Sequence, residues 1–193
     1  GGSMSSIKLK HSGGNSVILA APSSNPASDR TLTLPGDADG TILTSNTATG
    51  KILQVVQGTS TTEDSFTTAS FVASSLSATI TPTAASSKIL IQSSFLVDTK
   101  AAGRQIQVAV YRSINGGTFT NISGGSNTMA IATYAGNSRL IEQASVLRLD
   151  TPSYSVGNSI VYKLYGKSES ATGLVTLQSQ GNEGVIILQE VAA

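Results

Sequence analysis

The sequence has no cysteine, no tryptophan and a single histidine. Without cysteine, the chain forms no disulfide bond and performs no thiol chemistry. A zinc site on one chain is excluded in practice, because such sites use several His or Cys ligands. A protein of this composition that has to survive outside a cell must obtain its stability in another way.

Charge is scarce as well. Charged residues make up 12% of the chain, about half the usual share, and the net charge is +1. No basic cluster is present to follow a phosphate backbone, so nucleic acid is not an expected partner. No apolar run approaches the ~20 residues that span a bilayer, and no positively charged leader precedes an apolar stretch. We therefore expect neither membrane insertion nor export through a signal peptide.

The sequence is rich in Ser, Thr, Gly and Val, which suit strands and turns, and it lacks long stretches with helical spacing. This composition predicts an all-β fold. Residues 1–3, Gly-Gly-Ser, precede Met4 and are interpreted as an expression scar, with the native chain expected to start at Met4. The rest divides into a shaft-like trimerising segment, residues 4–47, and a tip domain, residues 48–193.

The shaft-like segment contains very short predicted strands, at residues 7–10, 17–20, 31–34 and 41–44. Ordering backbone costs roughly 1–2 kcal/mol per residue, which four such strands cannot offset alone. One interpretation is a disordered linker. The preferred interpretation is that copies from other subunits complete a core at a three-fold axis, whose predicted members are Leu32, Leu34, Ile42 and Leu43.

The tip domain shows roughly ten longer strands with regular turn signals. In residues 105–113, Ile106, Val108 and Val110 alternate with polar or small residues, which is typical of a half-buried strand. The sequence NGG at residues 115–117 predicts a hairpin turn, with residues 118–122 as the return strand. Residues 65–73 are also expected to form one strand. The pattern indicates a β-sandwich, expected to be of the jelly-roll type, with a barrel as the alternative.

Several strands carry apolar residues on both faces. Val185 and Ile187 oppose Ile186 and Leu188, for example, and the strand that begins at Lys51 has the same character. An isolated sandwich needs only one apolar face per sheet. The second apolar face reflects either ordinary scatter of surface residues or coverage by neighbouring subunits. Coverage also accounts for the shaft-like segment, so we expect an intertwined homotrimer.

Two blocks of the sequence resemble the distal regions of phage tail-fibre and receptor-binding proteins, notably those of marine and cyanobacterial phages. The first block is IKLKHSGGNSVILAAP followed by TLTLPGDADGTILT, which is similar to shaft-to-tip repeats. The second contains, in the order typical of the family, KILQVVQGTSTT, SATITPTAASSKILIQSSF, QVAVYRS, NSIVYKLYGKS and GVIILQEVAA. The resemblance spans nearly the whole chain and is one of pattern, without a catalytic signature.

The resemblance implies a trimeric jelly roll of the C1q and tumour-necrosis-factor type, located in the virion as a tail-fibre tip. It implies no enzymatic activity and no cofactor. The implied partners are a host cell-surface glycan or outer-membrane protein and other phage tail proteins. Two alternatives remain open: a virion decoration protein without a receptor, and a bacterial carbohydrate-binding adhesin module. The second is less favoured, because exposed Trp platforms are usual in such modules.

The resemblance carries over no receptor-binding residue, so candidates come from residue type and turn context. Loop tyrosines offer a large rigid surface and a hydroxyl group. Tyr134 precedes the turn AGNS, and Tyr154 lies in the turn DTPSYSVGN. The candidate receptor-binding residues are Tyr134, Asn137, Arg139 and Tyr154. Tyr162 and Tyr165, within a predicted strand, are expected in a core or an interface.

Catalytic and metal sites receive little support. His11 is the only available base for a Ser-His-Asp site and sits in a turn-like stretch, although three copies about an axis could hold an ion. The sequence DADG at residues 37–40 departs from a calcium-loop pattern and indicates a polar turn. Glu63 and Asp64 are adjacent, whereas glycosidase carboxylates face each other across a bond. We expect no catalytic residue and no metal ligand.

Overall fold

The structure is a computed structural model that describes residues 6–20, 24, 27–28, 51–124, 130–133, 138–169 and 173–193. The chain divides into two units, Gly1–Thr44 and Ser45–Ala193, which are treated separately below. The boundary predicted between residues 47 and 48 lies outside the described residues, as do the predicted strands at 31–34 and 41–44.

In the first unit, β1 (Ser6–Lys10) pairs antiparallel with β2 (Ser16–Ala20). This hairpin confirms the first two strands predicted from the sequence. The His11 ring accepts a hydrogen bond from the backbone N–H of Gly13 at 3.0 Å, so the histidine shapes the turn between the strands. Ile7, Leu9 and Ile18 are all more than half exposed, so these three apolar side chains are largely uncovered within the described part of the chain.

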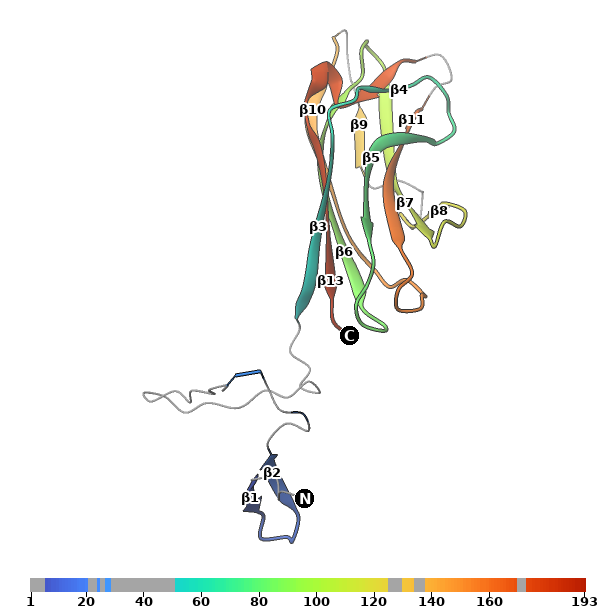
Figure 1. Ribbon diagram of the computed structural model, residues 1–193. Helices are drawn as coiled ribbons and strands as arrows, with labels where there is room; N and C mark the ends of the chain where they lie inside the picture. Colours follow the sequence, from blue (N-terminus) through green and yellow to red (C-terminus); the bar gives the residue numbers. More distant parts are fainter. Residues whose placement is uncertain are drawn as a thin grey trace, which may run out of the picture. The chain divides into compact units, whose positions relative to one another are not determined.

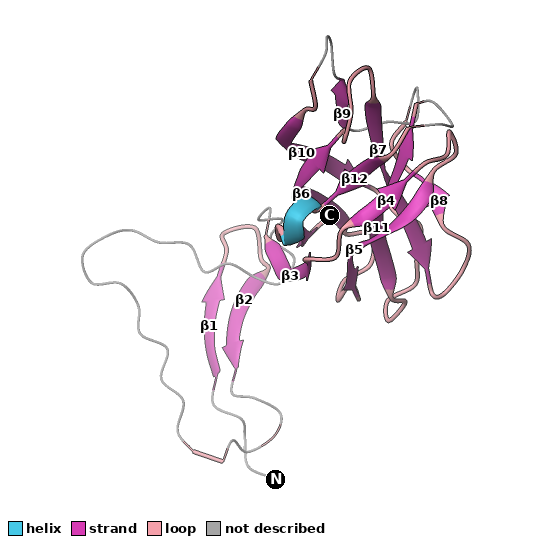
Figure 2. Cartoon of the chain, turned by 90° about the horizontal axis from the view of Figure 1, so that it is seen from above, coloured by secondary structure: helices cyan, strands magenta, loops and turns pink. Residues whose placement is uncertain are grey.

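The second unit consists of two antiparallel sheets (Figures 1 and 2). In sheet 1, β3 (Ile52–Ser60) pairs with β13 (Gly184–Val191), β13 with β6 (Lys88–Asp98), and β6 with β10 (Ile141–Asp150). Two short strands, β12 (Val175–Leu177) and β4 (Asp64–Phe66), extend this sheet beside the last residues of β6. Among the described residues the only helix is the 3₁₀ turn η1 (Ser179–Gly181).

Sheet 2 has the order β5 (Val72–Ile80), β11 (Ile160–Ser168) and β7 (Gln105–Ile114). On its far side β7 pairs with β8 (Thr120–Asn121) and with β9 (Ala130–Thr133). Figure 2 shows β3, β6 and β10 on one side of the unit and β5, β7 and β11 on the other. The described strands thus form two packed layers, a β-sandwich-like arrangement, and do not close into one barrel.

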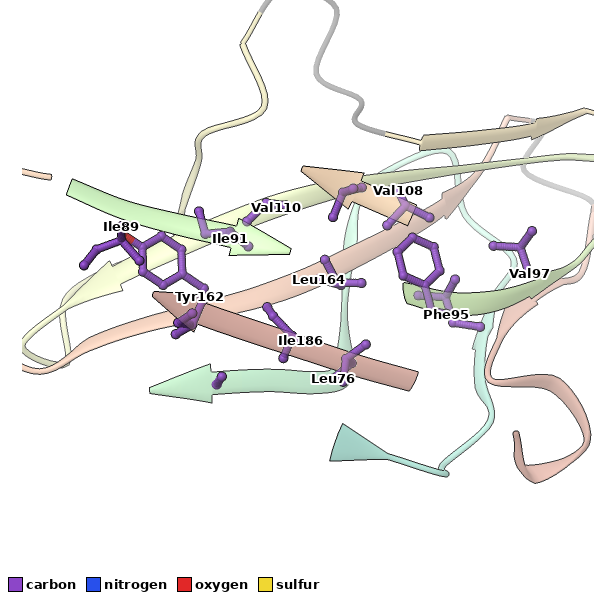
Figure 3. Close-up of a cluster of buried hydrophobic side chains, with 14 of the residues drawn as sticks. Leu76, Ile89, Ile91, Phe95, Val97, Val108, Val110, Tyr162, Leu164 and Ile186 are labelled. Atoms are coloured by element: carbon purple, nitrogen blue, oxygen red, sulfur yellow. The ribbon is translucent and has the colours of Figure 1, made fainter. Parts of the chain in front are cut away.

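The core lies between the two sheets (Figure 3). Sheet 1 contributes Ile91, Phe95 and Ile186, and sheet 2 contributes Val108 and Leu164, all fully buried. The alternation predicted for residues 105–113 is confirmed, because Ile106, Val108 and Val110 are all buried. The hydrophobic core of the sandwich is therefore formed by the inward-facing side chains of strands that are distant in sequence.

The prediction of one strand over residues 65–73 is wrong. β4 ends at Phe66 and β5 begins at Val72, and a turn held by the Thr68 hydroxyl donating to the Ser70 carbonyl separates them. The chain passes here from sheet 1 to sheet 2, so it must bend where the sequence pattern looks continuous. The hairpin at residues 115–117 is confirmed, with positive φ at Asn115 and Gly116, although β8 is shorter than predicted.

The two ends of the sandwich are distinguished by the strand register. Ile52 of β3 pairs with Val191 of β13, and the N–H of Ala192 donates to the carbonyl of Lys51. We call this end the base and the opposite end, where β6 reaches Asp98, the apex. Lys51, the first described residue of the second unit, lies at the base, and so does the C-terminus, as Figure 1 shows.

An ion pair inside the base links the sheets. Arg112 on β7 donates to both carboxylate oxygens of Asp150 on β10, at 2.8 and 3.0 Å. The hydroxyl of Tyr162 on β11 donates to the same carboxylate at 2.7 Å. Burial and the neighbouring Asp150 charge raise the pKa of Tyr162, so it stays protonated as a donor. Asp150 thereby connects sheet 1 to two strands of sheet 2 without an unpaired buried charge.

Gly58 allows the edge strands of the two sheets to approach each other. It lies on β3, and a Cβ atom there would overlap the backbone carbonyl of Ser77 on β5. We expect Gly58→Ala to lower the free energy of unfolding by about 1–3 kcal/mol, because backbone atoms must shift to admit the methyl group. Urea denaturation measures this, with Thr59→Ala on the outward side of β3 as the control. Equal stability of wild type and Gly58→Ala would contradict the close approach.

Candidate functional site

The outward faces of the two sheets differ in chemistry, and this difference defines the candidate site. Residues that alternate with the core positions point away from the sandwich. On sheet 1 the outward positions in the middle of the sheet, between the rows of Leu90 and Leu96, are uncharged, and about half of them are aliphatic. On sheet 2 they carry aromatic rings and lysines.

The uncharged face of sheet 1 extends across four strands. Its outward residues between the rows of Leu90 and Leu96 include no charged side chain, and the charged residue Lys88 stands at its base margin. Leu147 is 66% exposed, Val55 60% and Leu149 50%. The apolar members of these rows are Val55, Leu90, Leu96, Leu147, Leu149, Val185 and Ile187, and Leu53, Ile141 and Val191 lie at the margins of the face. Contiguous apolar surface of this kind on a folded chain marks an interaction site.

The uncharged face is hollowed near its centre. A shallow depression of about 410 Å³ lies over β13, β6 and β10, and Gln92, Leu147 and Ile187 are among its lining residues. Polar residues on the face bond to one another: the Gln189 amide donates to Gln92 at 3.2 Å, and the Gln143 amide donates to Ser94 at 2.6 Å. The face therefore has no ionic group to be desolvated when another surface covers it.

Sheet 2 carries what we call the aromatic–lysine patch, a group of partly exposed side chains on its outward face. Most come from β7 and β11, where Lys163 pairs in register with Tyr111 and Tyr165 pairs with Ala109. Two aromatic rings from the connections that flank these strands complete the patch. Its members are Phe71, Tyr111, Phe119, Lys163, Tyr165 and Lys167.

The rings of the aromatic–lysine patch are packed on one another. Tyr111 and Tyr165 stack with centroids 3.8 Å apart and an interplanar angle of 21°. Phe71 meets Tyr111 edge-on at 6.0 Å, and Phe119 lies 5.9 Å from Tyr165. Ala109 is fully buried although it faces outward, because the neighbouring side chains cover it. The rings thus form an ordered layer on the sheet.

The polar groups of the aromatic–lysine patch remain available. The ammonium of Lys167 lies 4.7 Å from the centroid of Phe71, and that of Lys163 lies 5.8 Å from Phe119, both within cation–π range. Within the described part of the chain, neither ammonium has a carboxylate partner, and the Tyr111 and Tyr165 hydroxyls have no hydrogen-bond partner. Burial and the adjacent Tyr111 raise the pKa of Tyr165. The patch therefore presents two cations and two hydroxyl donors.

The predicted candidate Arg139 lies at the apex in a charged network. Its guanidinium donates to both oxygens of the fully buried Asp98, through Nε at 2.7 Å and through Nη2. Lys100 pairs with Asp98 at 3.1 Å and with Glu63 at 2.8 Å, and Ser179 donates to Asp98 at 2.7 Å. Arg139 thus covers Asp98 at the apex, and 39% of the Arg139 side-chain surface is exposed.

The network also shifts the pKa of its carboxylates. Burial alone would raise the pKa of Asp98, but hydrogen bonds from Arg139, Ser179 and Lys100 outweigh it and hold that pKa well below its usual range. The hydrogen bond from Lys100 lowers the pKa of Glu63. Glu63 and Asp64 have separate partners, since Asp64 accepts from the N–H and hydroxyl of Ser75. The two neighbouring carboxylates are therefore engaged by different groups.

Tyr154, another predicted candidate, lies at the base. Its ring packs against the core, and its hydroxyl donates to the Ala84 carbonyl at 2.7 Å. Tyr154 follows the end of β10 at Asp150, which pairs with Ile89 of β6. Arg139 precedes the start of β10 at Ile141, which pairs with Asp98 at the other end of β6. At about 3.3 Å per residue along β6, the two candidates are separated by roughly 30 Å. The structure therefore does not bring them into one site.

The other residues predicted for the receptor site and the trimer core belong to segments outside the described residues. Tyr134 and Asn137 lie outside the described residues, as do Leu32, Leu34, Ile42 and Leu43 and the DADG turn at residues 37–40. Within the described part of the chain, no group of three or more His, Asp or Glu residues could hold a metal ion. The same part contains no helix long and apolar enough to cross a membrane.

The aromatic–lysine patch is not among the sites predicted from the sequence, and the sequence-based prediction for its residue Tyr165 is different. It placed Tyr165 with Tyr162 in a core or an interface, but the two face opposite sides of β11: Tyr162 is fully buried and Tyr165 is partly exposed. The signal that could have found the patch is the alternation Lys163–Tyr165–Lys167. No protein-family model matches the chain, and no similar curated protein is found.

Proposed function

We propose that the protein is a non-enzymatic structural protein of a virion, the tip of a trimeric tail fibre that attaches to the bacterial host surface. The uncharged face of sheet 1 is the observation that carries this proposal. Charged residues are depleted in the centres of protein interfaces, and obligate interfaces resemble a core cut in half. Two identical partners supply such coverage in a homotrimer, and the depression at Leu147 and Ile187 accepts their side chains.

The strand pairing supports a jelly roll of the C1q and tumour-necrosis-factor type. The eight principal strands pair from the outside inward: β3 with β13, β5 with β11, β6 with β10, and β7 with β9. This nested pattern is that of one long antiparallel hairpin rolled into two sheets. Jelly rolls consist of eight strands arranged in this way. The resemblance to phage tail-fibre tips leads to the same topology.

The difference in surface chemistry between the outward faces of the two sheets supports a role in adhesion. If sheet 1 is covered by partners, sheet 2 is left facing outward with its aromatic–lysine patch. A trimer presents three such patches, and a virion with several fibres presents more. Multiple weak contacts then give strong attachment through effective concentration, without any new contact.

Mass and adsorption measurements test the proposal. Light scattering is expected to give about three times the 19.6 kDa of one chain. The same measurement without residues 1–47 shows whether the shaft-like segment or the tip holds the trimer together. A stable folded monomer at micromolar concentration would overturn the trimer. Labelled protein is expected to adsorb to host cells and to compete with the phage, and failure to do so would favour a decoration role in the virion.

A further inference from the structure

We propose that the aromatic–lysine patch binds an anionic sugar chain, laid along β11 on the outward face of sheet 2. This inference deepens the adhesive role proposed above and rests on it. It selects a glycan bearing carboxylate or phosphate groups over a protein receptor, and it assigns the contact to residues of β7 and β11 away from the apex and the base.

The spacing of the cations favours an extended anionic ligand. Lys163, Tyr165 and Lys167 occupy alternate positions of β11, so all three point outward. At about 3.3 Å per residue, the two lysines attach to the sheet roughly 13 Å apart, with the tyrosine between them. A sugar chain along the strand therefore meets a cation, then an aromatic layer, then a second cation.

The two ammonium groups of the patch have no ion-pair partner in the described ranges, and the next acidic residue along the chain is the exposed Glu169, one alternate position beyond Lys167. The outward positions of β5, β7 and β11 include no acidic residue. Elsewhere on the sandwich, by contrast, Lys100 and Arg112 are held in ion pairs. Two free cations on one face attract an anionic ligand and accelerate its encounter.

The aromatic layer suits the apolar faces of sugar rings. The stack of Tyr111 on Tyr165 is rigid before the ligand arrives, which reduces the side-chain entropy lost on binding. The two hydroxyls have no partner in the described part of the chain and can donate to sugar hydroxyls or to the anionic group. A flat, ordered surface with dispersed polar groups fits a sugar chain better than it fits a protruding protein loop.

A glycan array carrying uronic-acid, phosphorylated and neutral bacterial oligosaccharides tests the proposal with the full-length protein. We expect binding to anionic spots that exceeds binding to neutral ones and that weakens as salt is raised. The double variant Lys163→Gln/Lys167→Gln is expected to lose at least tenfold in binding. Lys8→Gln/Lys10→Gln, which removes the same charge from exposed positions on β1, is expected to bind as the wild type does.

Two further variants test what the Tyr165 hydroxyl and the aromatic stack contribute to binding, and folding is checked for both. Tyr165→Phe tests the hydroxyl and keeps the stack, whereas Tyr165→Ala removes the stack, and near-ultraviolet circular dichroism and mass check their folding. The uronic-acid and phosphorylated spots distinguish the two sources of negative charge. Binding to neutral glycans alone, no binding to the array, or equal losses for the two double lysine variants would each overturn the inference.

Cell adsorption distinguishes this inference from the proposed function. If the wild type adsorbs to host cells and Lys163→Gln/Lys167→Gln adsorbs equally well, the patch is not the receptor site and the adhesive role stands. If the wild type does not adsorb, the adhesive role itself fails.

Discussion

Replacing Leu147 with aspartate is expected to convert the proposed homotrimer into a folded monomer. Leu147 is 66% exposed in the single chain and lines the depression on the uncharged face. In a trimer, each copy of the variant would place a carboxylate in a surface that has no cation to pair with it. Removing an unpaired charge from water costs several kcal/mol even after relaxation, and the cost arises three times.

Light scattering measures the outcome directly, since the mass should fall from about three times the 19.6 kDa of one chain to that of a single chain. The single chain itself should tolerate the change, because substitutions at exposed positions are usually within about 0.5 kcal/mol of neutral. Circular dichroism should therefore show the same β-rich spectrum. The prediction thus separates assembly from folding.

Val156→Asp provides the matched control. Val156 is 56% exposed and lies in the β10–β11 connection, outside the uncharged face, so the same change in charge should leave the trimer intact. A wild-type trimer that persists in Leu147→Asp would show that the subunits meet elsewhere. Dissociation of both variants to the same extent would show that charge in general, and not this face, controls assembly.

Much of the fold could be predicted from local pattern. The alternation of Ile106, Val108 and Val110 revealed which side of β7 is buried, and the opposition of Val185 and Ile187 to Ile186 and Leu188 revealed two apolar faces on β13. Both follow from the two-residue period of a strand, which requires no knowledge of partners. The turn at Asn115 could be predicted for the same reason, because Asn and Gly accept positive φ.

The candidate site could not be predicted, because it depends on register between distant strands. Tyr111 stacks on Tyr165 only because β7 and β11 pair so that Tyr165 lies opposite Ala109. A shift of one residue would turn Tyr165 into the core. Arg139 illustrates the same limit: its turn context suggested a free surface residue, whereas its partner Asp98 is far from it in sequence and beside it at the apex.

Replacing Asp98 with asparagine is expected to destabilise the sandwich by about 3 kcal/mol at neutral pH, because breaking a buried ion pair leaves its partners uncompensated. Asp98 is fully buried and accepts hydrogen bonds from Arg139, Lys100 and Ser179. Chemical denaturation of wild type and variant at pH 7 gives the difference. Gln92→Ala, on the same strand but at an exposed position, is the control and should change stability little.

The pH dependence identifies the charge as the cause. The folded-state pKa of Asp98 is depressed below its ordinary value of 3.8, so the unfolded chain binds the proton more readily than the folded one. The stability from Asp98 is therefore complete above pH 3.8 and is lost as the pH falls toward the folded-state pKa. Below about pH 4, the free energy of unfolding should fall more steeply with pH for the wild type than for Asp98→Asn. The difference in stability between the two proteins should therefore narrow there. A difference that stays constant from pH 7 down to pH 2 would mean that shape or packing, and not the paired carboxylate, stabilises the apex.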